Sequence, residues 1–408
     1  MRFRNDMTHA VVMAWARRGA LSLALAGALL LAFTGVVLAQ ASSPPARGAE
    51  GVGPERYIVV LEDGAGQAPV QAANEHARRY GLQVRHVYQN AIKGYAAVIP
   101  NEQVADVRDD ERVAYVEQDQ LMTTVYQTLP WGIDRIDADK SSTRAGNGSG
   151  AITNVNAYII DTGIKTHADL NVVKHINFHG GKNTDCDGHG THVAGTVAAK
   201  DDASDVVGAA PGAPLTGVKV LGCNGSGRTS NIIKGIDWVT ANAKKPAVAN
   251  MSLSGRTSRA LDDAVRKSAS RGIFYTVAAG NAGADACTES PARAGAGTNN
   301  GIMTVAATDS VNLEASFSNY GSCVDIWAPG VDIPSTQMGG GTTTMSGTSM
   351  ASPHVAGGAA LYLSKNTLLG APLVSAPNVE SQLKLDAIAT RTSSKDGAAI
   401  KLLYAGKY

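Results

Sequence analysis

Apolar runs separated by helix-like stretches constrain the fold of this chain more than any other feature. Five short runs are dominated by apolar residues: Val155–Ile160, Leu215–Val220, Val248–Ser252, Phe274–Ala278 and Met303–Ala306. Such runs are typical of parallel sheets that are covered on both faces. Helix-like stretches can supply the cover: His189–Ala199, Ser230–Ala243, Ser258–Arg271 and Ser349–Lys365. We therefore predict an α/β domain with a mostly parallel sheet and helices on both faces.

The composition and net charge argue against nucleic acid as a partner. The 408 residues carry a net charge of +1, and charged residues make up 17% of them, so the chain has no basic footprint for nucleic acid. This length leaves room for about two or three domains. Glycine is abundant (45 residues) and aromatic residues are scarce (5%), which suits a sheet with many tight turns.

The first residues are typical of an export signal. Arg17 and Arg18 precede an apolar run from about Ala20 to Val37, and a small-residue cleavage site follows near Ala39. We predict that residues 1–39 are a secretory signal peptide and that the protein is secreted without stable membrane association. The apolar run is near the length that spans a bilayer, so an uncleaved membrane anchor is the alternative.

A second pattern precedes the α/β region. After a spacer rich in Pro, Gly and Ser (about residues 42–55), the strand-like and helix-like segments follow the order β-α-β-β-α-β: Arg56–Leu61, Ala68–Tyr80, Val84–Tyr88, Gly94–Ile99, Asn101–Asp109 and Val113–Glu117. This order is that of the split βαβ, or ferredoxin-like, α+β domain. We predict a small separate domain of this kind.

Three short motifs carry the chemistry, in the order Asp161-Thr162-Gly163, His189–Gly195 and Gly347–Pro353. A carboxylate, an imidazole and a hydroxyl are the parts of a nucleophilic triad, and Asp–His–Ser is one of its known chain orders. Asp161 would orient the imidazole, His189 would act as general base, and Ser349 would be the nucleophile at a helix N-terminus.

Each motif residue also has a plainer interpretation. Ser349 alone would be an ordinary helix N-cap, and His192 competes with His189 for the role of base. Asp-Thr-Gly is also the signature of aspartic proteases, which need two such carboxylates, whereas the sequence has this tripeptide once. Asn281, just past a strand, would donate its side-chain amide to an oxyanion, or would be an Asn tolerated in a left-handed turn.

Together the three motifs resemble the subtilisin-like serine proteases, specifically the proteinase K branch, from about Trp131 to the C-terminus. The resemblance implies that residues 125–408 are a monomeric serine endopeptidase that hydrolyses unfolded or flexible proteins through an acyl-enzyme. Residues 40–124 resemble the propeptide of that family, which implies a folding aid that then inhibits and is self-cleaved near Met122 to Tyr126. The alternatives are a permanent small domain and, for the whole chain, a non-catalytic secreted binding protein on a protease scaffold.

The resemblance also implies where a substrate binds. Gly225-Ser226-Gly227 and Ser252-Leu253-Ser254-Gly255 resemble the family strands that flank a bound peptide, and Ala279 and Gly280 would form a wall of the pocket for the residue before the cut bond. Small apolar walls favour apolar or aromatic side chains, and no acidic residue is clearly placed to require Lys or Arg. Ser254 stands where the family motif has Gly, which would narrow the pocket mouth.

Four cysteines agree with export and allow three pairings. We favour Cys186–Cys223 and Cys287–Cys323; the placement most resembles aqualysin-type members of the family. The alternative is a zinc site, because Cys186, His189 and His192 are spaced like zinc ligands.

Calcium is the ion that the resemblance implies, held structurally by carboxylates and backbone carbonyls. Asp325 stands where proteinase K carries a calcium ligand. The preceding loop, Pro291 to Gly301, is longer by a few residues, so the carbonyl partners of Asp325 are left open.

Overall fold

The computed structural model describes residues 56–62, 68–119 and 127–408, which belong to two compact units that divide after Met122. The expected signal peptide, the spacer and the expected self-cleavage region near Met122 to Tyr126 lie outside the described residues. Within the described ranges, no helix is both long and apolar enough to cross a membrane.

The smaller unit is an α+β domain with a four-stranded antiparallel sheet in the order β2-β3-β1-β4. Its elements are β1 (Arg56–Leu61), α1 (Pro69–Tyr80), β2 (Gln83–Tyr88), β3 (Gly94–Val98), η1 (Asn101–Gln103), α2 (Val104–Arg108) and β4 (Val113–Gln118). Val59, Tyr95 and Val107 are fully buried in its core, where His76 Nδ1 lies 2.5 Å from the Tyr95 hydroxyl. The predicted β-α-β-β-α-β order is confirmed.

The larger unit contains a nine-stranded sheet in the order β16-β17-β13-β12-β10-β8-β5-β7-β6, and its neighbouring strands are parallel except for the β16–β17 pair. The strands are β5 (Asn156–Asp161), β6 (Val172–Asn177), β7 (Leu215–Lys219), β8 (Ala247–Met251), β10 (Phe274–Ala278), β12 (Ile302–Thr308), β13 (Ile326–Pro329), β16 (Ile388–Ser393) and β17 (Ala399–Leu402). The predicted mostly parallel sheet is therefore confirmed.

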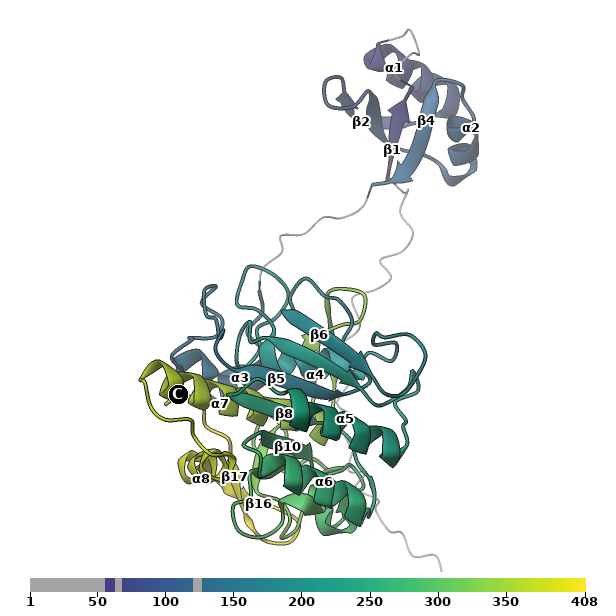
Figure 1. The fold of residues 1–408 in the computed structure, drawn as a ribbon. Coiled ribbons are helices and arrows are strands. Elements are labelled where there is room, and N and C mark those ends of the chain that lie inside the picture. Colours follow the sequence, from purple (N-terminus) through teal and green to yellow (C-terminus); the bar gives the residue numbers. More distant parts are fainter. Residues whose placement is uncertain (1–55, 63–67, 120–126) are drawn as a thin grey trace, which may run out of the picture. The chain divides into compact units, whose positions relative to one another are not determined.

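Helices cover both faces of this sheet (Figure 1). The main ones are α4 (His189–Ala198), α5 (Thr229–Asn242), α6 (Arg259–Ala269), α7 (Thr348–Leu368) and α8 (Ala376–Asp386), with the short α3 (Trp131–Arg135) preceding the sheet. Successive side chains of a strand point to opposite faces, so Tyr158 and Ile160 pack with α5 and α6 whereas Ala157 and Ile159 pack with α4 and α7. This double cover is why the strands are apolar on both faces.

Two disulfides cross-link the larger unit, Cys186–Cys223 and Cys287–Cys323. They are the pairs favoured from the sequence. They join residues 37 and 36 apart in the chain, and loop-closure entropy for such loops corresponds to about 4 kcal/mol each. Because Cys186 is bonded to Cys223, the zinc alternative is wrong.

The parallel topology gathers residues distant in the sequence at one edge of the sheet. Asp161 and Lys219 end β5 and β7, Ser252 directly follows β8, and Asn281 follows β10 by three residues. In open α/β sheets the crevice beyond the carboxyl ends of the strands is where ligands bind. The functional site is therefore expected at this edge.

Candidate active site

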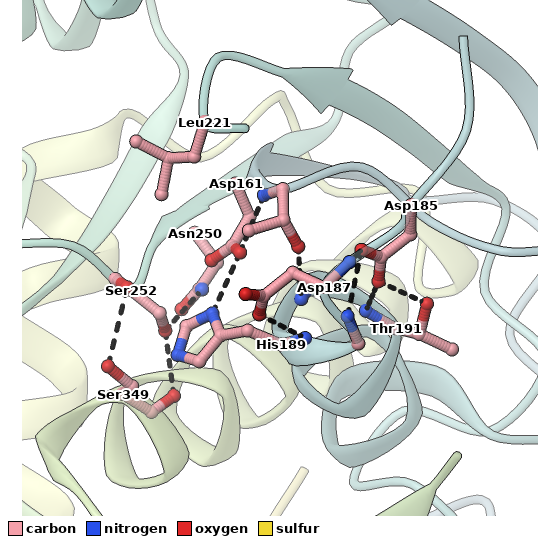
Figure 2. Close-up of polar contacts among 12 residues, drawn as sticks. Asp161, Asp185, Asp187, His189, Thr191, Leu221, Asn250, Ser252 and Ser349 are labelled. Atoms are coloured by element: carbon pink, nitrogen blue, oxygen red, sulfur yellow. Dashed lines mark hydrogen bonds and ion pairs between the residues drawn. The ribbon is translucent and has the colours of Figure 1, made fainter. Parts of the chain in front are cut away.

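Asp161 and His189 form a direct hydrogen bond in which Asp161 Oδ1 lies 2.7 Å from His189 Nδ1 (Figure 2). The same oxygen accepts the backbone N–H of Thr162 at 2.7 Å. Asp161 is fully buried, whereas a quarter of the His189 side chain is exposed. A carboxylate can only accept, so Nδ1 carries the proton and Nε2 is left as an acceptor that faces the cleft.

Helix α4 holds His189 against β5 at close range. The carboxylate of Asp185 accepts hydrogen bonds from the backbone N–H groups of Asp187 and Gly188 and from both the N–H and the hydroxyl of Thr191. A Cβ at Gly190 would come within 2.1 Å of the Gly163 carbonyl oxygen, so no larger residue fits there. The glycine after His189 is thus required by close packing of the helix on the strand.

Charge around His189 sets its basicity. Burial lowers the pKa of His189, but the negative charge and hydrogen bond of Asp161, with smaller effects of Asp187 and Asp185, outweigh it and raise the pKa above its ordinary value. His192, one turn along α4, is fully buried and bonds through Nε2 to the Ile333 carbonyl. Burial lowers the pKa of His192 to about 4, so His192 is neutral at pH 7. Its partner is Ile333 and not Asp161, which leaves His189 as the histidine that the carboxylate orients.

Ser349 lies across the cleft from Asp161, in the first turn of α7, with the His189 imidazole between them (Figure 2). Its hydroxyl donates to the Ser252 carbonyl at 3.3 Å, and its own carbonyl accepts the Ser252 hydroxyl at 2.7 Å. That carbonyl is free because its partner within the helix would be the N–H of residue 353, which is proline. Pro353 in the third motif therefore leaves the Ser349 carbonyl free to accept the Ser252 hydroxyl, which links the end of β8 to the first turn of α7.

A buried polar network behind Ser252 was not anticipated from the sequence. Asn250, in β8, donates to the Ser252 hydroxyl at 2.9 Å and accepts hydroxyls from Thr276 in β10 and Ser352 in α7. It links β8 and β10 to the helix that carries Ser349. Figure 2 shows its contact with Ser252. The sequence did contain one sign of this network: Asn250 is a polar residue within a strand that is otherwise buried and apolar.

Lys219 is the second unanticipated residue. It is 1% exposed, and its ammonium donates to the carbonyls of Thr162 and Leu221 at 2.7 and 2.8 Å. Burial lowers its pKa, and the nearby carboxylates of Asp185, Asp187 and Asp161 oppose that shift. Lys219 thereby fixes the turn that follows Asp161.

Asn281 is oriented by the first residue of α7. Its Oδ1 accepts the backbone N–H of Thr348 at 2.9 Å and the Thr348 hydroxyl at 2.8 Å. The amide nitrogen is left without a hydrogen-bond acceptor among the described residues, and Asn281 lines the same cleft as Ser349. A donor fixed in this way is available to an oxygen bound beside Ser349.

The cleft itself has a volume of about 490 Å³. It brings together most of the residues expected to bind substrate, with others: Thr162, Asp187, His189, Leu221, Gly225, Ser226, Gly227, Ile232, Ser252, Leu253, Ser254, Asn281 and Ser349. Three expected residues are not part of its lining. Gly255 begins the short strand β9 (Gly255–Arg256), Ala279 is fully buried, and Gly280 is buried next to Asn281.

A hydroxyl, an imidazole that can accept its proton and a buried carboxylate that orients the imidazole define the class of serine hydrolases. Comparison with known proteins narrows the class. Residues 154–396 match the subtilase family, and residues 56–125 match peptidase inhibitor I9. The chain therefore belongs to the subtilase family, and it is a subtilisin-like serine protease that carries an inhibitor I9 unit.

Relatives of the chain are similar across both units. The chain is 41% identical over 383 residues to alkaline serine exoprotease A of Vibrio alginolyticus, covering 86% of this chain and 67% of the relative. It is 42% identical over 350 residues to an extracellular serine proteinase of a Thermus species, covering 76% and 80%. A crystal structure of a cold-adapted subtilisin-like serine proteinase superposes with a TM-score of 0.59 at 42% identity, covering 67% of this chain and 97% of that one.

Proposed function

We propose that the protein is a secreted, self-processing endopeptidase that cuts unfolded or flexible proteins and acts as a monomer. Residues 1–39 would leave as a signal peptide, residues 40–124 would be a propeptide, and residues 125–408 would be the enzyme. The 2.7 Å contact between His189 and Asp161, with Ser349 across the same cleft, is the observation that carries the proposal. The extracellular serine proteinase among the relatives supports secretion.

Catalysis would proceed through an acyl-enzyme. His189 Nε2 takes the proton of the Ser349 hydroxyl as Oγ attacks the peptide carbonyl carbon, and the protonated imidazole then gives that proton to the departing amine. A water molecule, which gives its proton to His189 in the same way, then attacks the ester carbonyl carbon and releases the acid and the Ser349 hydroxyl. In the structure the Ser349 hydroxyl donates to the Ser252 carbonyl at 3.3 Å and not to His189, so this step requires the hydroxyl to turn toward His189 Nε2. Catalytic hydrogen bonds of this kind often form fully only when substrate binds.

Negative charge on the carbonyl oxygen would be stabilised by the amide nitrogen of Asn281 and the backbone N–H of Ser349. The Asn281 amide is held in place beforehand by Thr348, so no reorganisation is needed as charge develops. Gly225–Gly227 and Ser252–Ser254 line the cleft and lie outside the strands, so their main-chain groups would be available to pair with a substrate strand on either side. Main-chain pairing explains a broad tolerance of substrate sequence.

The propeptide would inhibit by presenting its C-terminal tail to the same cleft. The inhibitor I9 match, which extends to residue 125, supports this role. The smaller unit has its own hydrophobic core, as a folding aid that is later released requires.

Calcium at Asp325 does not fit the residues present there. Lys384 Nζ lies 2.6 Å from Asp325 Oδ1 and 2.5 Å from Glu380 Oε1, and the other oxygen of Asp325 accepts the Thr304 N–H. The ammonium of Lys384 thus takes the position that a cation would need. No group of three or more His, Cys, Asp or Glu side chains suited to a metal occurs in the described part of the chain.

A different group fits structural calcium. Asp169 is 1% exposed, and its Oδ1 has no hydrogen-bond partner among the described residues. Burial, with smaller effects of Asp202 and Asp205, raises the pKa of Asp169 to about 7, and a bound cation would keep it ionised. The Gln127 side-chain amide donates to the carbonyls of Lys200 and Val206, and the Val206 N–H donates to Asp169 Oδ2 at 3.4 Å. We propose that these oxygen-bearing groups hold calcium, which would tie the start of the enzyme to the loop after α4.

Calcium removal is expected to lower the melting temperature of the mature enzyme by about 5 °C, because a ligand present at about 100 times its dissociation constant contributes about 2.7 kcal/mol. Asp169→Asn should lower the melting temperature in calcium and abolish the difference between calcium and chelator. Asp325→Asn is the matched control: it loses the Lys384 pair but keeps the calcium response. Thermal denaturation of the three proteins with calcium or EDTA measures this, and a full calcium response in Asp169→Asn would contradict the site.

A fluorophosphonate probe tests the function directly. The mature protein is expected to digest casein and to take up one probe per chain on the peptide that contains Ser349, because an activated serine hydroxyl attacks phosphorus as it attacks a carbonyl. Peptide mapping by mass spectrometry locates the label. A folded protein that neither labels nor digests casein would instead favour the binding-protein alternative.

A further inference from the structure

A carboxylate lies between Ser254, which lines the cleft, and Gly280, which the family resemblance places at the pocket wall. Glu289 begins the short strand β11 (Glu289–Ser290), which pairs antiparallel with β9 so that Glu289 is opposite Arg256. The Glu289 carboxylate accepts the hydroxyl of Ser254, which lines the cleft. It also lies against Gly280, where an added Cβ would come within 2.4 Å of Glu289 Oε2.

The charge of Glu289 is available to a ligand. The side chain is half-buried, and among the described residues it takes part in no ion pair and has Ser254 as its one side-chain hydrogen-bond partner. Arg256, which is opposite in the strand pair, is exposed and makes no ion pair with it within that part of the chain. A carboxylate in this position has unused capacity to accept charged hydrogen bonds.

We propose that Glu289 determines specificity, and that the pocket for the residue before the cut bond accepts lysine and arginine as well as apolar side chains. The inference rests on the proposed function. Leu253, which lines the cleft, is an apolar group that suits the aliphatic stem of a basic side chain, while its charged end would meet Glu289 beside Ser254. An acidic group in the equivalent pocket is how trypsin selects basic residues.

With Glu289 beside it, the pocket would not be restricted to the apolar or aromatic side chains that its small apolar walls favour. Glu289 is 35 residues beyond Ser254 in the sequence, so the acidic group becomes visible only when β9 and β11 pair. The expected self-cleavage region, near Met122 to Tyr126, contains neither Lys nor Arg, so the pocket must also accept uncharged residues. The pocket would therefore accept both basic and uncharged side chains, unlike the pocket of trypsin, which selects basic residues.

Peptide p-nitroanilides that differ only in the last residue, Arg, Lys or Phe, test the claim on the mature enzyme. The wild type is expected to cleave all three, with kcat/KM for Arg and Lys within about tenfold of Phe. Glu289→Gln should lower kcat/KM for Arg and Lys by about tenfold or more, the scale of a charge-assisted hydrogen bond, and leave Phe within about twofold. Asp263→Asn, which removes an exposed charge on α6, is the control and should change none of the three.

Other outcomes separate the inference from the proposed function. Cleavage after Phe but not after Arg or Lys would overturn the role of Glu289 and leave the protease intact, whereas cleavage of no substrate would overturn both. An equal loss on all three substrates in Glu289→Gln would show that Glu289 only supports the pocket. Wild-type inhibition by peptide aldehydes ending in argininal or phenylalaninal provides a readout that does not depend on folding of a variant, and argininal should inhibit within about tenfold of phenylalaninal.

Discussion

Ser349→Ala is expected to lower casein and peptide hydrolysis by on the order of 10⁶-fold, the scale measured for subtilisin, a relative that serves as the reference case. The variant should also remain at full length, because processing would use the same hydroxyl. The reason is that alanine leaves His189 and Asn281 in place but removes the atom that forms the acyl-enzyme. Intact mass and hydrolysis rates of wild type and variant, purified side by side, measure both effects.

Ser352→Ala provides a matched control three residues along α7. It removes a hydroxyl from the Asn250 network rather than from the reacting position, so its loss should be far smaller. Processing of the Ser349→Ala chain in the absence of any other protease would contradict the assignment of the nucleophile.

Asp161→Asn is expected to lower kcat/KM by about 10⁴-fold at pH 7. Asp161 Oδ1 accepts from both Thr162 N–H and His189 Nδ1. An asparagine that turns its NH₂ toward His189 forces the proton onto Nε2, and Nε2 can then no longer accept the proton of Ser349. An asparagine that keeps its oxygen there instead buries the NH₂ where Oδ2 now has no partner among the described residues. Either arrangement is costly.

The pH profile distinguishes this cause from misfolding. His189 must be neutral to act as base, and because its pKa is raised in the wild type, kcat/KM should rise with pH through a midpoint above 6.5. In Asp161→Asn the carboxylate charge is gone, so the midpoint of the residual activity should move to lower pH. A variant with reduced activity but the wild-type midpoint would contradict the role of Asp161.

Local patterns predicted most of the fold and the central residues of the site. β10 begins and ends where the apolar run predicts, and α4 begins at His189 as expected. β6 and α8 were not predicted, because the residues that form them have mixed burial. β6 lies at the edge of the sheet with exposed positions, and α8 packs only one stripe, including Val379 and Leu383, against the core.

The rest of the site depends on contacts between distant segments. Each triad residue is surrounded by a recognisable local motif, whereas Asn250 and Lys219 act through neighbours up to 102 and 57 residues away. Asp325 illustrates the converse: its position in the sequence resembles a calcium ligand, but Lys384, which approaches from α8, already pairs with it. The identity of a side chain does not reveal which partner the fold brings to it.

The disulfide between Cys186 and Cys223 affects what happens when another protease molecule cuts the chain. The interval that it closes contains α4, with His189, and the internal strand β7, which pairs with β5 on one side and β6 on the other. A single cut at a loop inside this interval would leave the two new ends attached through sulfur as well as through the sheet. A nick there therefore yields one two-piece molecule that retains His189, instead of releasing a fragment.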